Sequence, residues 1–136
     1  MESATDKARK DDIAEVINLY YHIVDTYDAN RMAEIFSDDC VIDLSEFGAP
    51  LRVGIDKIIE SFSGTGPRMV LAHMGTNMRI ELVGEEARCV TKCIALLEGG
   101  KTSVAIHSDK LRHTAKGWRV YERKMTMPAP LKASLG

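Results

Sequence analysis

The sequence predicts an α+β domain with helices packed against one face of a curved antiparallel sheet. Two patterns indicate this fold class: helical spacing of apolar residues prevails before residue 63, and β-rich runs separated by glycines fill most of the remaining chain. The length of 136 residues suits one hydrophobic core. We therefore expect a single domain over residues 1–136, with a pocket between the helices and the concave face of the sheet.

The chain is expected to begin with a long amphipathic helix. Its apolar residues recur at i, i+3, i+4 and i+7 spacing: Ile13, Val16, Ile17, Tyr20, Val24 and Tyr27. Asp28 follows this helix and precedes another short helical pattern over residues 29–36. Because aspartate favours the N-cap position, Asp28 is predicted to open a second helix.

The strands are predicted mainly in the second half of the chain. Residues 40–44 predict a first strand, and residues 55–62 predict a third helix before a turn at Gly64, Gly66 and Pro67. Further strands are predicted at residues 69–74, 77–83, 87–97, 102–113 and 118–127. Gly84, Gly99, Gly100 and Gly117 indicate hairpin turns between them. We expect an antiparallel meander, followed by a loosely held terminus over residues 128–136.

Composition argues against several classes of protein. A net charge of -2 with scattered lysines and arginines provides no basic stripe, so we expect no nucleic-acid partner. No apolar run approaches the roughly 20 residues that span a bilayer, and the polar start is unlike a secretory signal, which predicts a cytoplasmic protein without a membrane partner. Three cysteines without CxxC spacing, and the lack of phosphate-binding, dinucleotide or HExxH motifs, predict neither a metal nor a cofactor.

Asp25 and His73 are the leading candidates for chemistry. Asp25 lies four residues after Tyr21, at the margin of the apolar helix face, where a partly buried carboxylate needs a partner. His73 lies in an apolar run, where a strand would turn alternate side chains toward the pocket. Histidine transfers protons near neutral pH when a carboxylate holds its other ring nitrogen. The structural alternatives are an exposed aspartate at the helix end and a core histidine.

Other residues could support such a pair. His107 is a candidate for a second pocket histidine, whereas His22 and His113 are expected on the outside. Arg123 alternates with apolar neighbours and could place a cation near a developing anion, or could form a salt bridge on an edge strand. Three residues combine an apolar ring with a hydroxyl that suits a moist pocket: Tyr20, Tyr21 and Tyr27.

Three segments carry a resemblance that covers nearly the whole chain: YYHIVDTYDANRMAEIFSDDCVIDL, LAHMGTNMRIELVG and KGWRVYERKM. Together they resemble the SnoaL-like branch of the NTF2-like superfamily. Within it, HMGTNMRIELV and the Val24-Asp25 pair are most similar to hexachlorocyclohexane dehydrochlorinase, with bile-acid 7α-dehydratase and scytalone dehydratase as more distant relatives. The resemblance implies a cone-shaped α+β barrel and a homodimer or higher homo-oligomer.

The resemblance also implies roles for individual residues. Those enzymes use a histidine base paired with an aspartate, and the matching residues here are His73 and Asp25. Tyr20 matches a tyrosine that precedes the aspartate in the bile-acid enzyme, and Arg123 matches a pocket arginine of the dehydrochlorinase. Helical geometry instead puts Tyr21 on the side of Asp25. We therefore expect Asp25, His73 and Tyr20 to be catalytic, and three residues to bind substrate: Tyr21, His107 and Arg123.

The expected function is that of a lyase or isomerase that needs no cofactor. His73 would remove a proton from carbon in a small, largely apolar, cyclic or polyketide- or terpenoid-like substrate, while Asp25 stabilises the imidazolium. One alternative is a ketosteroid-isomerase-like enzyme with a carboxylate base, for which Asp43 is the nearest candidate. Another is a non-catalytic module for ligand binding or assembly, in which Asp25 and His73 would point apart.

Overall fold

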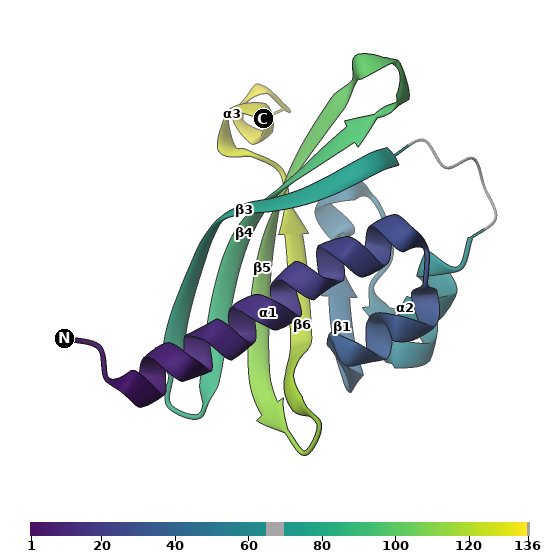
Figure 1. Cartoon of the computed structure of the whole chain (residues 1–136). Helices are drawn as coiled ribbons and strands as arrows, with labels where there is room; N and C mark the ends of the chain where they lie inside the picture. Colours follow the sequence, from purple (N-terminus) through teal and green to yellow (C-terminus); the bar gives the residue numbers. More distant parts are fainter. Residues whose placement is uncertain (65–69, 136) are drawn as a thin grey trace.

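The structure, a computed structural model, describes residues 1–64 and 70–135 (Figure 1). Its helical segments are α1 (Ala4–Thr26), η1 (Ala29–Glu34), η2 (Ser45–Phe47), α2 (Ile55–Phe62), η3 (Glu98–Gly100) and α3 (Ala129–Leu135). Its strands are β1 (Phe36–Asp43), β2 (Arg52–Val53), β3 (Val70–Val83), β4 (Glu86–Leu97), β5 (Thr102–Thr114) and β6 (Gly117–Thr126).

In the described part of the chain, all strands belong to one six-stranded sheet with the order β2-β1-β6-β5-β4-β3. Strands β3 to β6 form the expected antiparallel meander, and β1 joins it parallel to β6. The sheet is curved but not closed, and α1 crosses its concave side (Figure 1). The predicted α+β class, with helices covering a concave sheet face, is confirmed.

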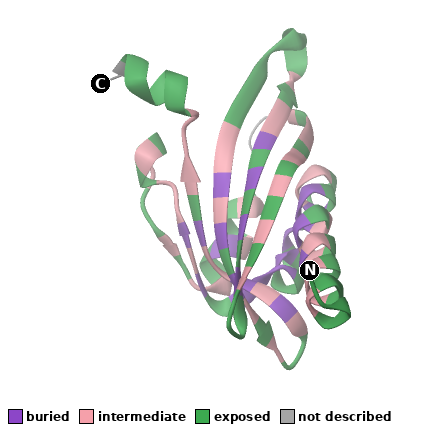
Figure 2. Cartoon of the chain, turned by 90° about the vertical axis from the view of Figure 1, so that its left-hand side faces the viewer, coloured by how far each residue is buried: buried purple, intermediate pink, exposed green. Residues whose placement is uncertain are grey.

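The core forms where the buried face of α1 meets the concave face of the sheet. On β4, buried side chains alternate with exposed ones, as the side chains of a strand covered on one face must (Figure 2). The buried set on β4 is Ala87, Cys89, Thr91 and Cys93. Helix α1 contributes Ile13, Ile17, Tyr20, Tyr21 and Ile23 to the same core. Cys89 and Cys93 therefore lie on the same, buried face of β4 as small apolar residues.

Strand β3 corrects the prediction of two short strands, because it runs without a break through Gly75. Its pairing with β4 shifts register between Thr76 and Arg79, where Asn77 adopts a φ of 55°. Asparagine tolerates this left-handed conformation better than most residues, so the strand absorbs an irregularity and continues. Strand β3 lies at the edge of the sheet, where such an irregularity disturbs only one ladder. Met69 lies outside the described residues, as do Gly66 and Pro67 of the predicted turn.

Three segment boundaries also differ from the predictions. The second helix is a short 3₁₀ helix, and the side chain of Asp28 makes no capping hydrogen bond there. Phe36 belongs to β1 instead, because the neighbouring strand pairs there: Val120 N–H donates to Ile35 O at 2.8 Å. Helix α3 forms in the segment expected to be a loose terminus, although its residues 129–134 are exposed. Tertiary pairing has overridden local helical propensity at residue 36.

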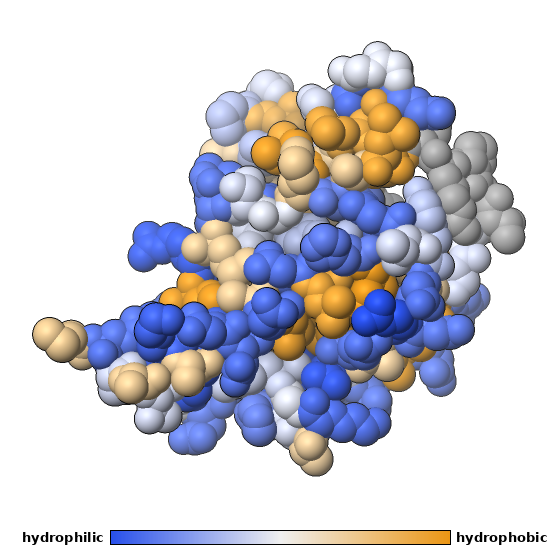
Figure 3. Space-filling model, viewed as in Figure 1, coloured by the Kyte–Doolittle hydropathy of each residue, from blue (hydrophilic) through white to orange (hydrophobic). Residues whose placement is uncertain are grey.

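Two features of the surface are relevant to partners. No helix in the described ranges combines the length and apolarity needed to cross a membrane. Hydrophobic side chains gather at the end of the molecule where the β3–β4 strands extend beyond α1 (Figure 3). Exposed apolar residues on these strands and on β5 include Leu71, Met74, Leu96 and Val104.

Candidate functional site

Asp25 and His73 form a close pair between α1 and β3. The Nδ1 atom of His73 lies 2.8 Å from Oδ1 of Asp25. The backbone N–H of His73 also donates to both carboxylate oxygens, at 3.0 and 3.1 Å. An ionised carboxylate can only accept hydrogen bonds, so the imidazole donates through Nδ1 and keeps its lone pair on Nε2. The pair therefore has the arrangement of a general base and its orienting carboxylate.

The position of β3 at the sheet edge explains why this contact can form. One side of an edge strand has backbone groups that no neighbouring strand pairs, and the N–H of His73 uses the Asp25 carboxylate as its acceptor. Asp25 lies in the last turn of α1, one helical turn beyond Tyr21. The carboxylate thus fixes both the imidazole and the strand that carries it.

Gly75 lets the helix approach β3 closely. A Cβ atom added at Gly75 would lie 2.0 Å from Cε2 of Tyr21, which is far inside any allowed contact. The step from Tyr21 to Asp25 along the helix is about 6 Å, and the step from Gly75 to His73 along the strand is about 6–7 Å. Because the two steps are nearly equal, the contact between Tyr21 and Gly75 also places Asp25 beside His73.

The dyad remains accessible although it faces the concave side of the sheet. The side chains of His73 and Asp25 are 23% and 26% exposed. The strand positions beside His73 carry small residues. His73 itself pairs with Ala95 on β4, and the neighbouring row consists of Gly75, Cys93 and Ala105. Short side chains next to the imidazole are consistent with its partial exposure.

A second, buried hydrogen-bond network lies deeper along the same face. The hydroxyl of Tyr21 lies 2.9 Å from Oγ1 of Thr91 and 3.2 Å from Nδ1 of His107. Thr91 and His107 are paired across β4 and β5, and they are 0% and 1% exposed. Burial, with a contribution from Arg123, lowers the pKa of His107 to about 2. His107 is therefore neutral, and in the described part of the chain its Nε2 atom has no hydrogen-bond partner.

Arg123 is held by a carboxylate that sequence reasoning missed. Its Nε and Nη2 atoms donate to Asp109 at 2.7 and 2.9 Å, and the two side chains are 1% and 0% exposed. Burial opposes the charge, but the Asp109 carboxylate outweighs it and raises the pKa of Arg123. The salt bridge considered as an alternative does form, but in the interior rather than at an edge, because β1 extends the sheet beyond β6.

Tyr20 and Tyr21 occupy different surroundings. The ring centre of Tyr20 lies 4.1 Å from the guanidinium carbon of Arg123, and the ring packs edge-to-face with Phe36 and Phe62, with ring centres 5.9 and 6.2 Å apart. Burial raises the pKa of Tyr20. Tyr21 instead lies one turn before Asp25 and contacts β3 and the Thr91–His107 pair.

The remaining sequence candidates lie outside this cluster. Tyr27 donates to the backbone oxygen of Val70 at 3.2 Å, and the side chains of His22 and His113 are exposed. Asp43 accepts a hydrogen bond from the backbone N–H of Ser45 at 2.9 Å, and hydrogen bonding to the Ser45 side chain and then to this N–H lowers the pKa of Asp43. A carboxylate stabilised in its charged form within a local turn is a weaker base, so the geometry disfavours Asp43 as the reactive group.

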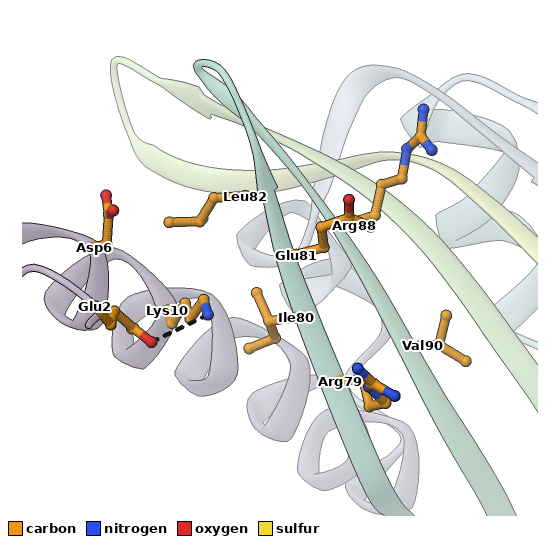
Figure 4. A pocket seen from close by; sticks show the side chains of 9 residues that line it. All are labelled: Glu2, Asp6, Lys10, Arg79, Ile80, Glu81, Leu82, Arg88 and Val90. Atoms are coloured by element: carbon orange, nitrogen blue, oxygen red, sulfur yellow. Dashed lines mark hydrogen bonds and ion pairs between the residues drawn. The ribbon is translucent and has the colours of Figure 1, made fainter.

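A surface hollow of about 650 Å³ lies away from the dyad, between the start of α1 and strands β3 and β4 (Figure 4). Its lining mixes both charges: Glu2, Asp6, Lys10, Arg79, Ile80, Glu81, Leu82, Arg88 and Val90. Glu2 and Lys10, both on the α1 side of this hollow, form an ion pair at 3.2 Å. Within residues 1–64 and 70–135, no three His, Cys, Asp or Glu side chains are grouped so that they could hold a metal ion.

The fold and this site define an NTF2-like α+β domain with a histidine–aspartate pair on the concave side of its sheet. The chain belongs to the SnoaL-like domain family, whose family model matches residues 6–124. This confirms the family expected from the sequence. No curated protein matches the chain.

Three solved structures from Novosphingobium aromaticivorans illustrate the likeness. A protein provisionally named an aromatic ring hydroxylase is 27% identical, with a TM-score of 0.73 and 87% of each chain covered. An NTF2-like protein with a cystatin-like fold is 22% identical, with a TM-score of 0.73, and the match covers 100% of this chain and 99% of that chain. A protein provisionally named a scytalone dehydratase is 19% identical, with a TM-score of 0.73, and the match covers 91% of this chain and 87% of that chain. The latter two likenesses concern the fold alone.

Proposed function

We propose that the protein is a lyase or isomerase that needs no cofactor and that uses His73 to remove a proton from carbon. The observation that carries this proposal is the 2.8 Å contact between Nδ1 of His73 and Asp25, which leaves Nε2 as the basic atom. A non-catalytic module would not require the two side chains to meet. Membership of the SnoaL-like family adds support, because one solved neighbour has been provisionally named a dehydratase.

In the proposed reaction, Nε2 of His73 takes the proton and the imidazole becomes an imidazolium. Asp25 fixes the tautomer beforehand and stabilises the positive charge afterwards, because its carboxylate already accepts hydrogen bonds from both the ring and the backbone N–H of His73. The electron pair of the broken C–H bond then either expels a leaving group from the adjacent carbon or moves into a neighbouring carbonyl as an enolate. Elimination and double-bond migration share this first step.

The buried polar groups are proposed to bind the other end of the substrate. Tyr21 and His107 share a hydrogen-bond network, and Arg123 lies against Tyr20. The sequence assigned the assisting role to Tyr20, and we propose that the two tyrosines divide the work. Tyr21 would present its hydroxyl from the helix turn before Asp25, while Tyr20 would hold Arg123 in place. The apolar rings and small strand residues suit a small, largely apolar, cyclic or polyketide- or terpenoid-like substrate.

The base is tested by proton exchange in heavy water, with 2-tetralone as a probe that has acidic protons next to a neutral carbonyl. The protein should accelerate the exchange above the buffer rate, as followed by proton NMR. His73→Ala should lose about 10²–10⁴-fold of this acceleration, the usual contribution of a positioned base. His22→Ala, which removes an exposed histidine from the same helix as Asp25, should leave the rate unchanged. An undiminished rate in His73→Ala would mean that His73 is not the base.

A further inference from the structure

The buried polar residues of the core carry no net charge. Five polar or charged residues are buried among those described: Ser37, Thr91, His107, Asp109 and Arg123. Asp109 and Arg123 bear opposite charges and meet through two hydrogen bonds. His107 is neutral because burial and the nearby Arg123 lower its pKa to about 2. The positive charge of Arg123 is therefore neutralised by the adjacent Asp109 carboxylate.

Two polar atoms in this cluster lack a partner in the described residues: Nε2 of His107 and Nη1 of Arg123. Both belong to side chains that are 1% exposed. Both side chains also contact Tyr20, since the His107 ring centre lies 5.9 Å and the guanidinium carbon 4.1 Å from the centre of its ring. Buried polar atoms are nearly always paired in folded proteins, by protein groups, water or a ligand, so these two atoms are free to accept and to donate one hydrogen bond each to a bound group.

The cluster and the dyad belong to one region. Tyr21 connects them, because its ring lies against Gly75 two residues from His73 while its hydroxyl lies 3.2 Å from Nδ1 of His107. The buried cluster therefore lies one side chain, that of Tyr21, away from the dyad.

We propose that Asp109 determines specificity by neutralising Arg123, so that the site accepts an uncharged carbonyl or hydroxyl oxygen and rejects a carboxylate or phosphate. The Nη1 atom of Arg123 still offers a hydrogen bond to a neutral oxygen. A carboxylate would have to give up its hydration and approach the buried charge of Asp109, without an unpaired cation to compensate. The identification of this ligand as the substrate rests on the proposed function, whereas the charge preference itself does not.

The test compares two probes of nearly equal shape, uncharged 2-naphthamide and anionic 2-naphthoate, titrated into the protein near pH 7 and followed by NMR. The native protein should bind the amide at least about tenfold more tightly. Asp109→Asn, which leaves Arg123 charged and unpaired, should reverse this order. Glu122→Gln removes one negative charge from a side chain that is 45% exposed and pairs with Lys110, and it should leave the order unchanged.

A second measurement keeps the proposal testable if Asp109→Asn fails to fold. The phenol 4-nitrophenol absorbs visible light only in its charged form, so binding to the native protein should decrease that absorbance by favouring the neutral form. An increase in absorbance, equal or tighter binding of 2-naphthoate, or no binding of either naphthyl probe would each overturn the proposal. His73→Ala should keep the preference for the amide. Failure of His73 as the base is therefore distinguishable from failure of the proposed role of Asp109 in charge preference.

Discussion

At the scale of single residues, the two inward-facing histidines differ because of their surroundings. His73 is partly exposed and has a carboxylate on Nδ1, an arrangement that suits the base of the proposed reaction. His107 is almost fully buried, with a tyrosine hydroxyl on Nδ1 and the Arg123 charge nearby. One histidine is thus arranged to gain a charge and the other to stay neutral.

The lowered pKa of His107 predicts a pH dependence of stability. In the unfolded chain a histidine binds a proton near pH 6.5, whereas folded His107 does so only near pH 2. The unfolded state therefore binds more protons between these values, and stability is complete above pH 6.5 and falls as the pH is lowered. The loss attributable to His107 should be about 1.4 kcal/mol per pH unit below 6.5.

This prediction is checked by urea unfolding at pH 7.5 and pH 5. His107→Gln preserves a hydrogen-bonding side chain but removes the titrating group, so its stability should change less between the two pH values than that of the native protein. His113→Gln removes an exposed histidine and should behave like the native protein. Equal pH dependence in the native protein and in His107→Gln would contradict the prediction.

The site residues differ in how far sequence can reveal them. Asp25 and His73 stand out because a carboxylate at the margin of an apolar helix face and a histidine in an apolar run both break a local pattern. Thr91 and Asp109 break none, since each lies in an ordinary alternating strand. Their partners come from the register of β4, β5 and β6, which pairs Thr91 with His107 and Asp109 with Arg123. Register is a tertiary property that residue spacing alone does not supply.

At the scale of elements, the packing of α1 on β3 sets the geometry of the dyad. Two short strands, at residues 69–74 and 77–83, were expected on either side of Gly75. The structure instead shows a continuous strand in which Gly75 provides the space for the Tyr21 ring. Glycine has two common meanings in a strand, a bend or a close approach, and only the position of the opposing helix distinguishes them.

Gly75→Ala is therefore predicted to disturb the site by overpacking. The added methyl group would overlap the Tyr21 ring, so the ring or the helix must shift, at a cost of about 1–3 kcal/mol in the free energy of unfolding. Tyr21→Ala should remove the overlap, so the double variant should lose less stability than the sum of the two single variants, as measured by urea unfolding. Gly64→Ala is the control, since a Cβ there meets nothing within 4 Å. Strict additivity would show that Gly75 and Tyr21 are not coupled.

At the scale of the whole molecule, α1 covers the concave side of the sheet (Figure 1). On β4, the side chains that alternate with the buried set, Val90 and Leu96 among them, turn to the outer face, and Val104 on β5 shares that face because it pairs with Ile94. Val90, Leu96 and Val104 are 43%, 38% and 39% exposed. An uncovered apolar sheet face is a common site of subunit association, which agrees with the homo-oligomer expected from the sequence.

We therefore predict that the protein is a homodimer or higher homo-oligomer held through this outer face. Light scattering coupled to gel filtration should then give a mass above the 15.1 kDa of one chain. Val104→Lys should shift the population toward the monomer, because in a symmetric interface the new charge occurs on both subunits and loses its hydration there. Leu51→Lys also replaces an exposed apolar side chain, 55% accessible and just before the short strand β2, and should leave the mass unchanged. The prediction would be contradicted if the native protein were monomeric at a concentration on the order of 100 micromolar. An unchanged mass for Val104→Lys would place the interface elsewhere.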